Sequence, residues 1–228
     1  GRGSSVGGVT APPHAPWALR GEALVALSWS RPDLPLAEGI EPAPGPTAVA
    51  AVRYTDSPVG PFLQLMVLVP GRLGTHLGWS AVAAVVDKPD AMVAHRMNWG
   101  IPSVLGELRW FARDGVRQLL WEDRDLSVKA RGRVVGVPMV MPHRLVQARA
   151  DGPVVVSDRH WGIFRPALVV IDCGARDALD CLRGRHLGAT VDGVHRTIAP
   201  ARTPVGLLAP LRAPATAEPL LRRPEPPA

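Results

Sequence analysis

The clearest change of pattern in this chain lies in Asp90-Ala-Met-Val-Ala-His-Arg-Met-Asn-Trp-Gly-Ile-Pro102, which continues as Ser103-Val-Leu-Gly-Glu-Leu-Arg-Trp110. Alanine and valine in the first part favour a helix, and Pro102 pushes the residue before it towards extended geometry, so a strand should follow. Between the two we expect an irregular loop next to an apolar core, a position where side chains often carry function. The polar and aromatic side chains of this loop are His95, Arg96, Asn98 and Trp99.

Length and composition predict one globular domain. The chain has 228 residues, of which 46% are hydrophobic, and nothing in it marks a linker near the midpoint. We place the domain at residues 16–203. Residues 1–15 and 204–228 are rich in glycine, proline or alanine and are expected to form flexible or surface-packed tails.

Charge and cysteine content restrict the possible partners. The formal net charge is +6, but arginines are scattered among acids, and few aromatic residues are available for base stacking, so we predict no nucleic-acid partner. No apolar run is long enough to span a bilayer, and we expect a soluble, cytoplasmic protein without a membrane partner. Cys173 and Cys181 have no second pair and no histidine at metal-ligand spacing, so we expect free buried thiols, no metal and no cofactor.

Turn signals along the chain predict a mainly β (α+β) fold. Short apolar segments such as Thr47 to Arg53 and Val116 to Trp121 are separated by glycine, proline and aspartate, which is typical of antiparallel sheets. Three separate strands are expected between Val154 and Asp172, with a turn at Asp158-Arg-His160. A second short helix is expected at Ala175 to Arg183, ended by Gly184. So many short strands need a closed or two-layered sheet to bury their faces.

Upstream, Tyr54-Thr-Asp-Ser-Pro-Val-Gly-Pro61 places a phenol and a carboxylate two residues apart. On a strand, Tyr54 and Asp56 would face the same side, and in an interior they could orient a polar substrate or exchange a proton with it. Alternatively, Asp56 caps backbone amides in an Asp-Ser-Pro turn. The residues themselves leave both interpretations open.

Taken together, the two stretches resemble the acetoacetate decarboxylase family. The resemblance is clearest from about Val52 to Trp110 and implies an antiparallel, cone-like β-barrel around a central cavity. It also implies that Asp56 is an active-site carboxylate. After Pro102, where that family has its Schiff-base lysine and a second lysine, this chain has Ser103 and Val104, and neither can form an imine. The family's lysine depends on a pKa lowered by a neighbouring cation, an effect for which acetoacetate decarboxylase is a standard example.

Further positions follow from the same resemblance. Arg96 matches an arginine that could bind a carboxylate in bidentate fashion, and a salt bridge is its structural alternative. Gln64 stands where related sequences carry a glutamate. His95 replaces a glycine; it could act as a general base, or it could be a hydrogen-bonded structural group. Asn98, Trp99 and Ser103 could line the cavity, although Trp99 could equally belong to the core.

These observations support two hypotheses. The first is an enzyme that has lost imine chemistry and converts a small oxo acid or carboxylate by proton transfer, as a lyase, hydratase or isomerase. Its candidate catalytic residues are Asp56, Tyr54 and His95, and its candidate substrate-binding residues are Arg96, Asn98, Trp99, Gln64 and Ser103. The second is a non-catalytic barrel that binds a small molecule. Either could form a homo-oligomer.

Overall fold

The computed structural model describes residues 12–174 and 177–204, which form mainly β-structure with one α-helix, α1 (Pro89–Trp99). The strands are β1 (Trp17–Ser28), β2 (Glu41–Pro42), β3 (Thr47–Asp56), β4 (Phe62–Leu73), β5 (His76–Val86), β6 (Ser103–Leu105), β7 (Leu108–Arg113), β8 (Val116–Trp121), β9 (Leu126–Arg131), β10 (Val137–Arg149), β11 (Gly152–Asp172) and β12 (Gly184–Ile198). Two 3-10 turns lie at Glu122–Arg124 and Asp180–Leu182.

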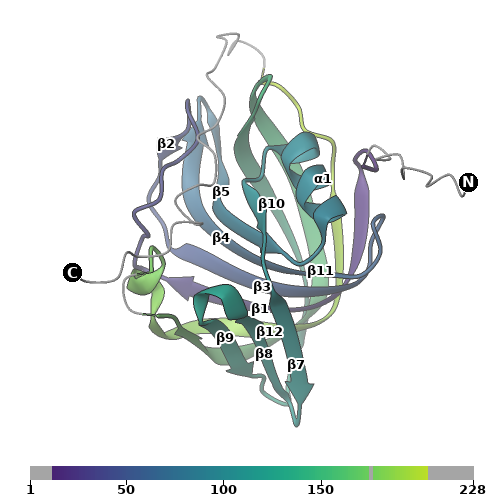
Figure 1. Cartoon of the computed structure of the whole chain (residues 1–228), viewed down its shortest axis with the longest axis vertical. Helices are drawn as coiled ribbons and strands as arrows, with labels where there is room; N and C mark the ends of the chain where they lie inside the picture. Colours follow the sequence, from purple (N-terminus) through teal and green to yellow (C-terminus); the bar gives the residue numbers. More distant parts are fainter. Residues whose placement is uncertain (1–11, 175–176, 205–228) are drawn as a thin grey trace, which may run out of the picture.

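The main strands close into a ring. The sheet order is β10-β5-β4-β3-β1-β12-β11-β9-β8-β7, and β10 pairs with β11 as well as with β5. Most pairs are antiparallel, but β10 meets β5 in parallel, with Leu145 opposite Trp79. Beyond the ring, the last part of β11 pairs with β9, so β7, β8 and β9 continue the sheet outside it (Figure 1).

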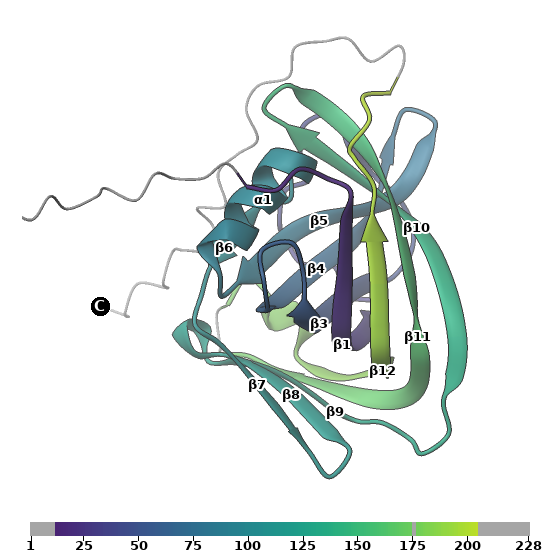
Figure 2. The ribbon, with the colours of Figure 1, turned by 90° about the vertical axis from the view of Figure 1, so that its right-hand side faces the viewer.

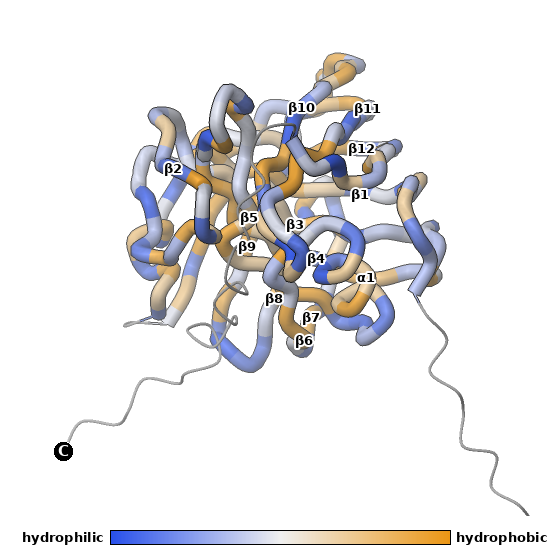
Figure 3. Tube along the Cα trace, turned by 90° about the horizontal axis from the view of Figure 1, so that it is seen from above, coloured by the Kyte–Doolittle hydropathy of each residue, from blue (hydrophilic) through white to orange (hydrophobic). Residues whose placement is uncertain are grey.

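The sheet has an apolar cluster on each face, because side chains alternate along every strand. In β3, Val52 and Tyr54 belong to the cluster inside the ring, whereas Val49 and Ala51 face outwards. The outward residues pack against Leu119 and other side chains of β7 to β9. Figure 2 shows these three strands at the opposite end of the molecule from α1. Figure 3 shows apolar stretches concentrated in the strands and hydrophilic ones mostly at the loops.

Helix α1 corrects one expectation from the sequence, because it continues through His95 to Trp99 instead of giving way to a loop. It ends at Gly100, which adopts a left-handed conformation with φ 69° and donates its N–H to the carbonyl of Arg96. Such an αL glycine is a common helix C-cap. Ala91, Ala94 and Trp99 face the inner cluster, so the helix covers part of the ring's interior.

Several predicted short strands are joined in longer ones. The three segments expected between Val154 and Asp172 form the single 21-residue strand β11, so Asp158-Arg-His160 lies within a strand and not in a turn. Pairing with β10 and β12 on both sides holds this segment extended, and local glycine and proline signals do not break it. Likewise, Pro70 and Gly71, two residue types typical of turns, lie within β4.

The prediction of a second helix is also wrong for the residues of that segment that the structure describes. Between residues 177 and 183, only the 3-10 turn Asp180–Leu182 is present, and residues 175–176 lie outside the described residues. Both cysteines are free thiols, as expected, but only Cys173 is buried; Cys181 is exposed, so its expected burial is wrong. Most of the two predicted tails lies outside the described residues, so the domain limits remain a prediction. Among the described helices, none is long and apolar enough to cross a membrane.

We predict that Gly100→Ala destabilises the protein more than Gly115→Ala. Both glycines have a positive φ, 69° and 73°, but a Cβ at Gly100 would lie 2.3 Å from the carbonyl oxygen of Ala148, whereas one at Gly115 meets nothing within 4 Å. The left-handed conformation should cost each variant about 1–2 kcal/mol. The backbone clash should cost Gly100→Ala about 1–3 kcal/mol more. Urea unfolding measures both losses, and equal losses would show that the turn relaxes freely.

Candidate functional site

A buried ion pair lies inside the ring, between Arg196 on β12 and Asp158 on β11. Nε of Arg196 donates to both carboxylate oxygens of Asp158, at 3.2 and 3.0 Å, and Nη2 donates to Oδ2 at 2.6 Å. Nη1 donates to the hydroxyl of Tyr54 on β3 at 2.6 Å. Three strands of the ring therefore meet at one guanidinium.

Electrostatics fixes the charge states of this group. Burial alone would raise the pKa of Asp158, but the charge of Arg196 holds it well below its usual value. Burial also opposes the charge of Arg196, yet Asp158 raises the arginine pKa above its ordinary value. For Tyr54, burial raises the pKa in spite of the nearby guanidinium. At neutral pH the group is therefore a carboxylate, a guanidinium and a protonated phenol.

Two histidines lie against the same carboxylate. Nε2 of His143 is 3.0 Å from Oδ2 of Asp158, and Nε2 of His160 is 3.2 Å from Oδ1. His143 is the cross-strand partner of Asp158, and His160 lies two residues further along β11, so all three side chains share one face of the sheet. Burial, reinforced by the charge of Arg196, lowers the pKa of His160 to about 4, so its imidazole is neutral at pH 7.

His95 and Ser103 form a second polar pair in the core. Nδ1 of His95 lies 2.9 Å from Oγ of Ser103, which β6 holds beside Ala84 of β5. The His95 ring packs against Phe62, Trp17 and Trp99, with ring centroids 5.9 to 6.3 Å apart. Burial among these rings lowers the pKa of His95 to about 3. This imidazole is therefore neutral and has little basicity at pH 7.

The structure separates Asp56 from Tyr54. Tyr54 is buried inside the ring and is the last β3 residue paired with β4, opposite Phe62. Asp56 lies beyond that pair, opposite Arg20 of β1, and is exposed. The expected meeting of the two side chains in the interior is not observed, because β3 loses its pairing with β4 after Tyr54 and its register with β1 shifts before Asp56.

The helix residues also take different positions from those expected. Arg96 is exposed, and its Nε donates to the backbone carbonyl of Ser103 at 2.7 Å. Asn98 donates to the carbonyl of Pro13 at 2.9 Å, and indole Nε1 of Trp99 donates to that of Ala199 at 3.0 Å. These side chains connect α1 to β6 and to the two ends of the described chain.

Two buried glutamines inside the ring have unpaired amide atoms. Gln64 lies two residues after Phe62 on the inner face of β4, and Gln147 lies two residues after Leu145 on the inner face of β10. Within the described residues, Oε1 of Gln64 and Nε2 of Gln147 have no hydrogen-bond partner. An unpaired buried polar group is costly, so these atoms are suited to a polar guest or to water.

Both lysines of the chain lie away from this interior. Nζ of Lys88 donates to the carbonyl of Val59 in the loop between β3 and β4. Lys129 is exposed on β9, which belongs to the extension outside the ring. In the part of the chain that the structure describes, no lysine side chain therefore lies inside the ring.

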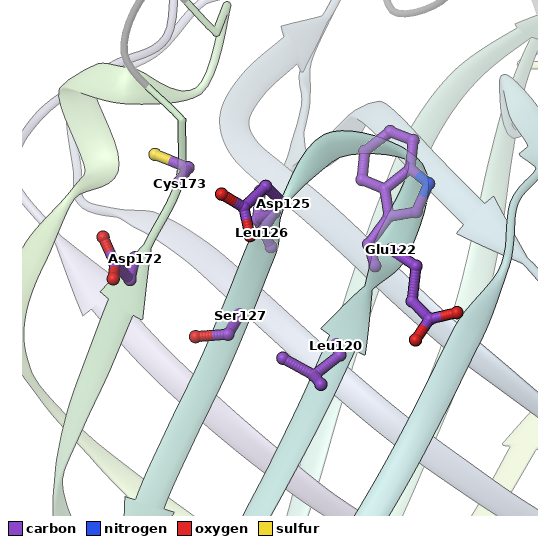
Figure 4. A pocket seen from close by; sticks show the side chains of 8 residues that line it. Leu120, Glu122, Asp125, Leu126, Ser127, Asp172 and Cys173 are labelled. Atoms are coloured by element: carbon purple, nitrogen blue, oxygen red, sulfur yellow. The ribbon is translucent and has the colours of Figure 1, made fainter.

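Among the described residues, one pocket is lined by two residues of the site and another lies apart from it. The first, of about 610 Å³, is lined by His143 and Asp158 together with exposed neighbours such as Arg144 and Arg159. The other, of about 370 Å³, lies beside β8, β9 and the end of β11, where Asp125, Ser127 and Asp172 surround it (Figure 4).

Comparison with solved structures places this architecture in a known class of fold. An acetoacetate decarboxylase from Legionella pneumophila superposes with a TM-score of 0.65 at 14% identity, over 88% of this chain and 92% of that one. The enduracididine biosynthesis enzyme MppR, solved in complex with pyruvate, gives 0.58 at 18% identity, over 87% and 94%. An acetoacetate decarboxylase-like enzyme from Sphingomonas wittichii RW1 gives 0.59 at 14%, over 87% and 96%.

The chain therefore has the acetoacetate decarboxylase-like fold, and the fold expected from the sequence is confirmed. No protein-family model matches the sequence, and no curated protein is significantly similar to it.

Sequence reasoning found Tyr54, Gln64, His95 and Ser103 as interior residues but missed the centre of the site. Arg196, Asp158, His143 and Gln147 come from strands that are distant in the chain, and no local motif connects them. Asp158 and His160 were mistaken for turn residues. An available signal was the alternation Val154, Val156, Asp158, which continues an inward-facing pattern.

We predict that His95 makes folding stability depend on pH. Its folded-state pKa of about 3 lies below the ordinary value of 6.5, so the unfolded chain binds a proton that the folded chain excludes. Stability from this group is therefore fully present above pH 6.5 and is lost as pH falls towards 3. Between pH 4.5 and 5.5, the free energy of unfolding should rise with pH less steeply for His95→Gln than for wild type. The two slopes should differ by about 1.4 kcal/mol per pH unit. Parallel slopes in urea titrations would contradict this.

Proposed function

We propose that the protein binds a small oxo acid or other carboxylate inside the ring and converts it by proton transfer, without a covalent imine. The fold supports this class of ligand, because one protein that shares it, MppR, has been solved with pyruvate bound. Fold alone does not carry function, however, and the argument rests on the residues of this chain.

The observation that carries the proposal is the buried guanidinium of Arg196. Its contacts engage Nε, one N–H of Nη1 and one N–H of Nη2. A guanidinium has five N–H groups, so each terminal nitrogen retains one that has no partner in residues 12–174 and 177–204. Two such donors in a buried setting suit a carboxylate, which forms strong charge-assisted hydrogen bonds there. On this proposal, Arg196 takes the anchoring role that the sequence suggested for Arg96.

The surrounding groups support a polar ligand with a second functional group. Tyr54 remains protonated at neutral pH and can donate its proton to a developing oxyanion, and Asp158 stays ionised beside it. The unpaired amide atoms of Gln64 and Gln147 offer an acceptor and a donor for a carbonyl or hydroxyl group. We therefore assign Tyr54 as the proton donor. Asp158, and not Asp56, is then the active-site carboxylate.

One observation favours the alternative of a non-catalytic binding protein. His95, the general base suggested by the sequence, has a pKa near 3 and contacts Ser103 within an aromatic shell. A base is most effective when its pKa lies near the working pH, so His95 fits a structural role better than a catalytic one. In this alternative, Arg196 still binds the carboxylate, but no proton is transferred.

We predict that pyruvate binds through Arg196 and not through Arg96. Arg196→Lys keeps the charge but loses the planar fork, and it should weaken binding by about 1.5–3 kcal/mol, the scale of a hydrogen bond to a charged group. Arg96→Lys is the matched control, because that side chain is exposed and should leave binding unchanged. Calorimetry measures both affinities.

Tyr54→Phe provides a second test that keeps the ion pair intact. It removes the hydroxyl that accepts a hydrogen bond from Nη1 of Arg196 and should alter pyruvate affinity without unfolding the chain. If Arg196→Lys and Tyr54→Phe both bind pyruvate as wild type does, the anchor is not at this group.

We predict proton exchange without covalent capture. In D2O, wild-type protein should accelerate loss of the C3 protons of pyruvate in NMR spectra, and borohydride should add no mass to the protein. A borohydride-trapped adduct on either lysine would overturn the proposal. Binding without any exchange above the buffer rate would support the non-catalytic alternative.

A further inference from the structure

His143, Asp158 and His160 form a cluster of metal-ligand type on neighbouring strands. One ligand atom from each residue lies within 4.8 Å of the other two, and the two imidazole-to-carboxylate distances are 3.0 and 3.2 Å. Ligand atoms around a tetrahedral zinc ion, bound at about 2.0–2.1 Å, are about 3.3 Å apart. The spacing of the three ligand atoms is therefore of the size that one bound ion requires.

The alternative role for these histidines is to donate hydrogen bonds to Asp158. In that role an N–H would point at a carboxylate oxygen, yet Nε2 of His160 is buried and has no hydrogen-bond partner among the described residues, despite lying 3.2 Å from Oδ1. The contact is therefore short without meeting the geometry of a hydrogen bond, which leaves Nε2 of His160 available to a ligand.

We propose that His143, Asp158 and His160 bind a divalent transition-metal ion such as Zn²⁺. Two imidazoles and one carboxylate are the donor set of many catalytic metal sites, which retain open coordination positions. The side chains of His143 and His160 are 19% and 25% exposed, so the ion can be reached from solvent.

Arg196 has a defined part in this site. Metal-binding carboxylates are usually oriented by hydrogen bonds from neighbouring groups, and the contacts of Nε and Nη2 hold Asp158 in this way. Zn²⁺ and Arg196 together carry more positive charge than Asp158 neutralises, so the open positions favour an anionic ligand. The sequence gave no sign of the site, because His143 and His160 lie on different strands and meet only through the pairing of β10 with β11.

Zinc binding tests the proposal without any carboxylate present, so its outcome is separate from that of the proposed function. The full chain, treated with chelator and dialysed, is titrated with Zn²⁺ in a calorimeter. We expect one equivalent to bind. His143→Ala and His160→Ala should each weaken binding at least about 100-fold, since even residues that only orient a ligand contribute 10–100-fold.

Two control variants test whether Zn²⁺ binds to other exposed side chains of the protein. His195→Ala removes an exposed imidazole on β12, beside Trp161, and Cys181→Ser removes the exposed thiol. Both should bind Zn²⁺ as wild type does. Co²⁺ gives a second readout, because ligation by the two imidazoles should produce a visible absorption band that His143→Ala abolishes. No zinc binding by wild type, or equal binding by both ligand variants, would overturn the proposal.

Discussion

The interior of this protein depends on the ion pair between Arg196 and Asp158. Removing a guanidinium from water is costly unless a carboxylate and further hydrogen bonds compensate it. Here, the compensation requires β3, β11 and β12 to hold their register, because a shift of one residue would turn a charge to the opposite face. Removing one partner of such a buried ion pair typically lowers the free energy of unfolding by about 3–5 kcal/mol. The site and the ring therefore stabilise each other.

The interior has two polar regions with different chemistry. Around Arg196 lie the charged groups and unpaired donors to which we assign the proposed carboxylate and metal binding. Around His95, an aromatic shell keeps an imidazole neutral, and Ser103 satisfies one of its nitrogens. The serine after Pro102 thus completes a packed, neutral contact between α1 and β6. Any chemistry of this chain is therefore expected in the region around Arg196.

Similar folds at 14–18% identity show how little of a sequence such a ring constrains. The ring needs alternating apolar positions and glycines where backbones approach closely, and many sequences provide both. At Gly21, for example, a Cβ would lie 1.9 Å from the carbonyl oxygen of Arg53. Interior polar residues are free to change once these conditions are met, so function has to be argued from the residues present.

The sequence by itself determined the fold class, the free cysteines and the lack of a lysine after Pro102, because each follows from local pattern or from residue identity. It also identified Tyr54 as an inward-facing residue. It misjudged the end of α1, since four polar or aromatic residues before Gly100 resembled a loop, and it divided β11, since glycine and proline were given more weight than pairing on both sides.

Only the tertiary structure decided which residues meet. Tyr54 and Arg196 are 142 positions apart, and Arg196 and Asp158 are 38 apart, so no spacing along the chain connects them. Asp56 and Arg96, both expected in the interior, are exposed because the register of β3 with β1 shifts after Tyr54 and because α1 turns Arg96 to its exposed face. The physical reason is that strand register and ring closure are set by long-range pairing, which local sequence patterns do not encode.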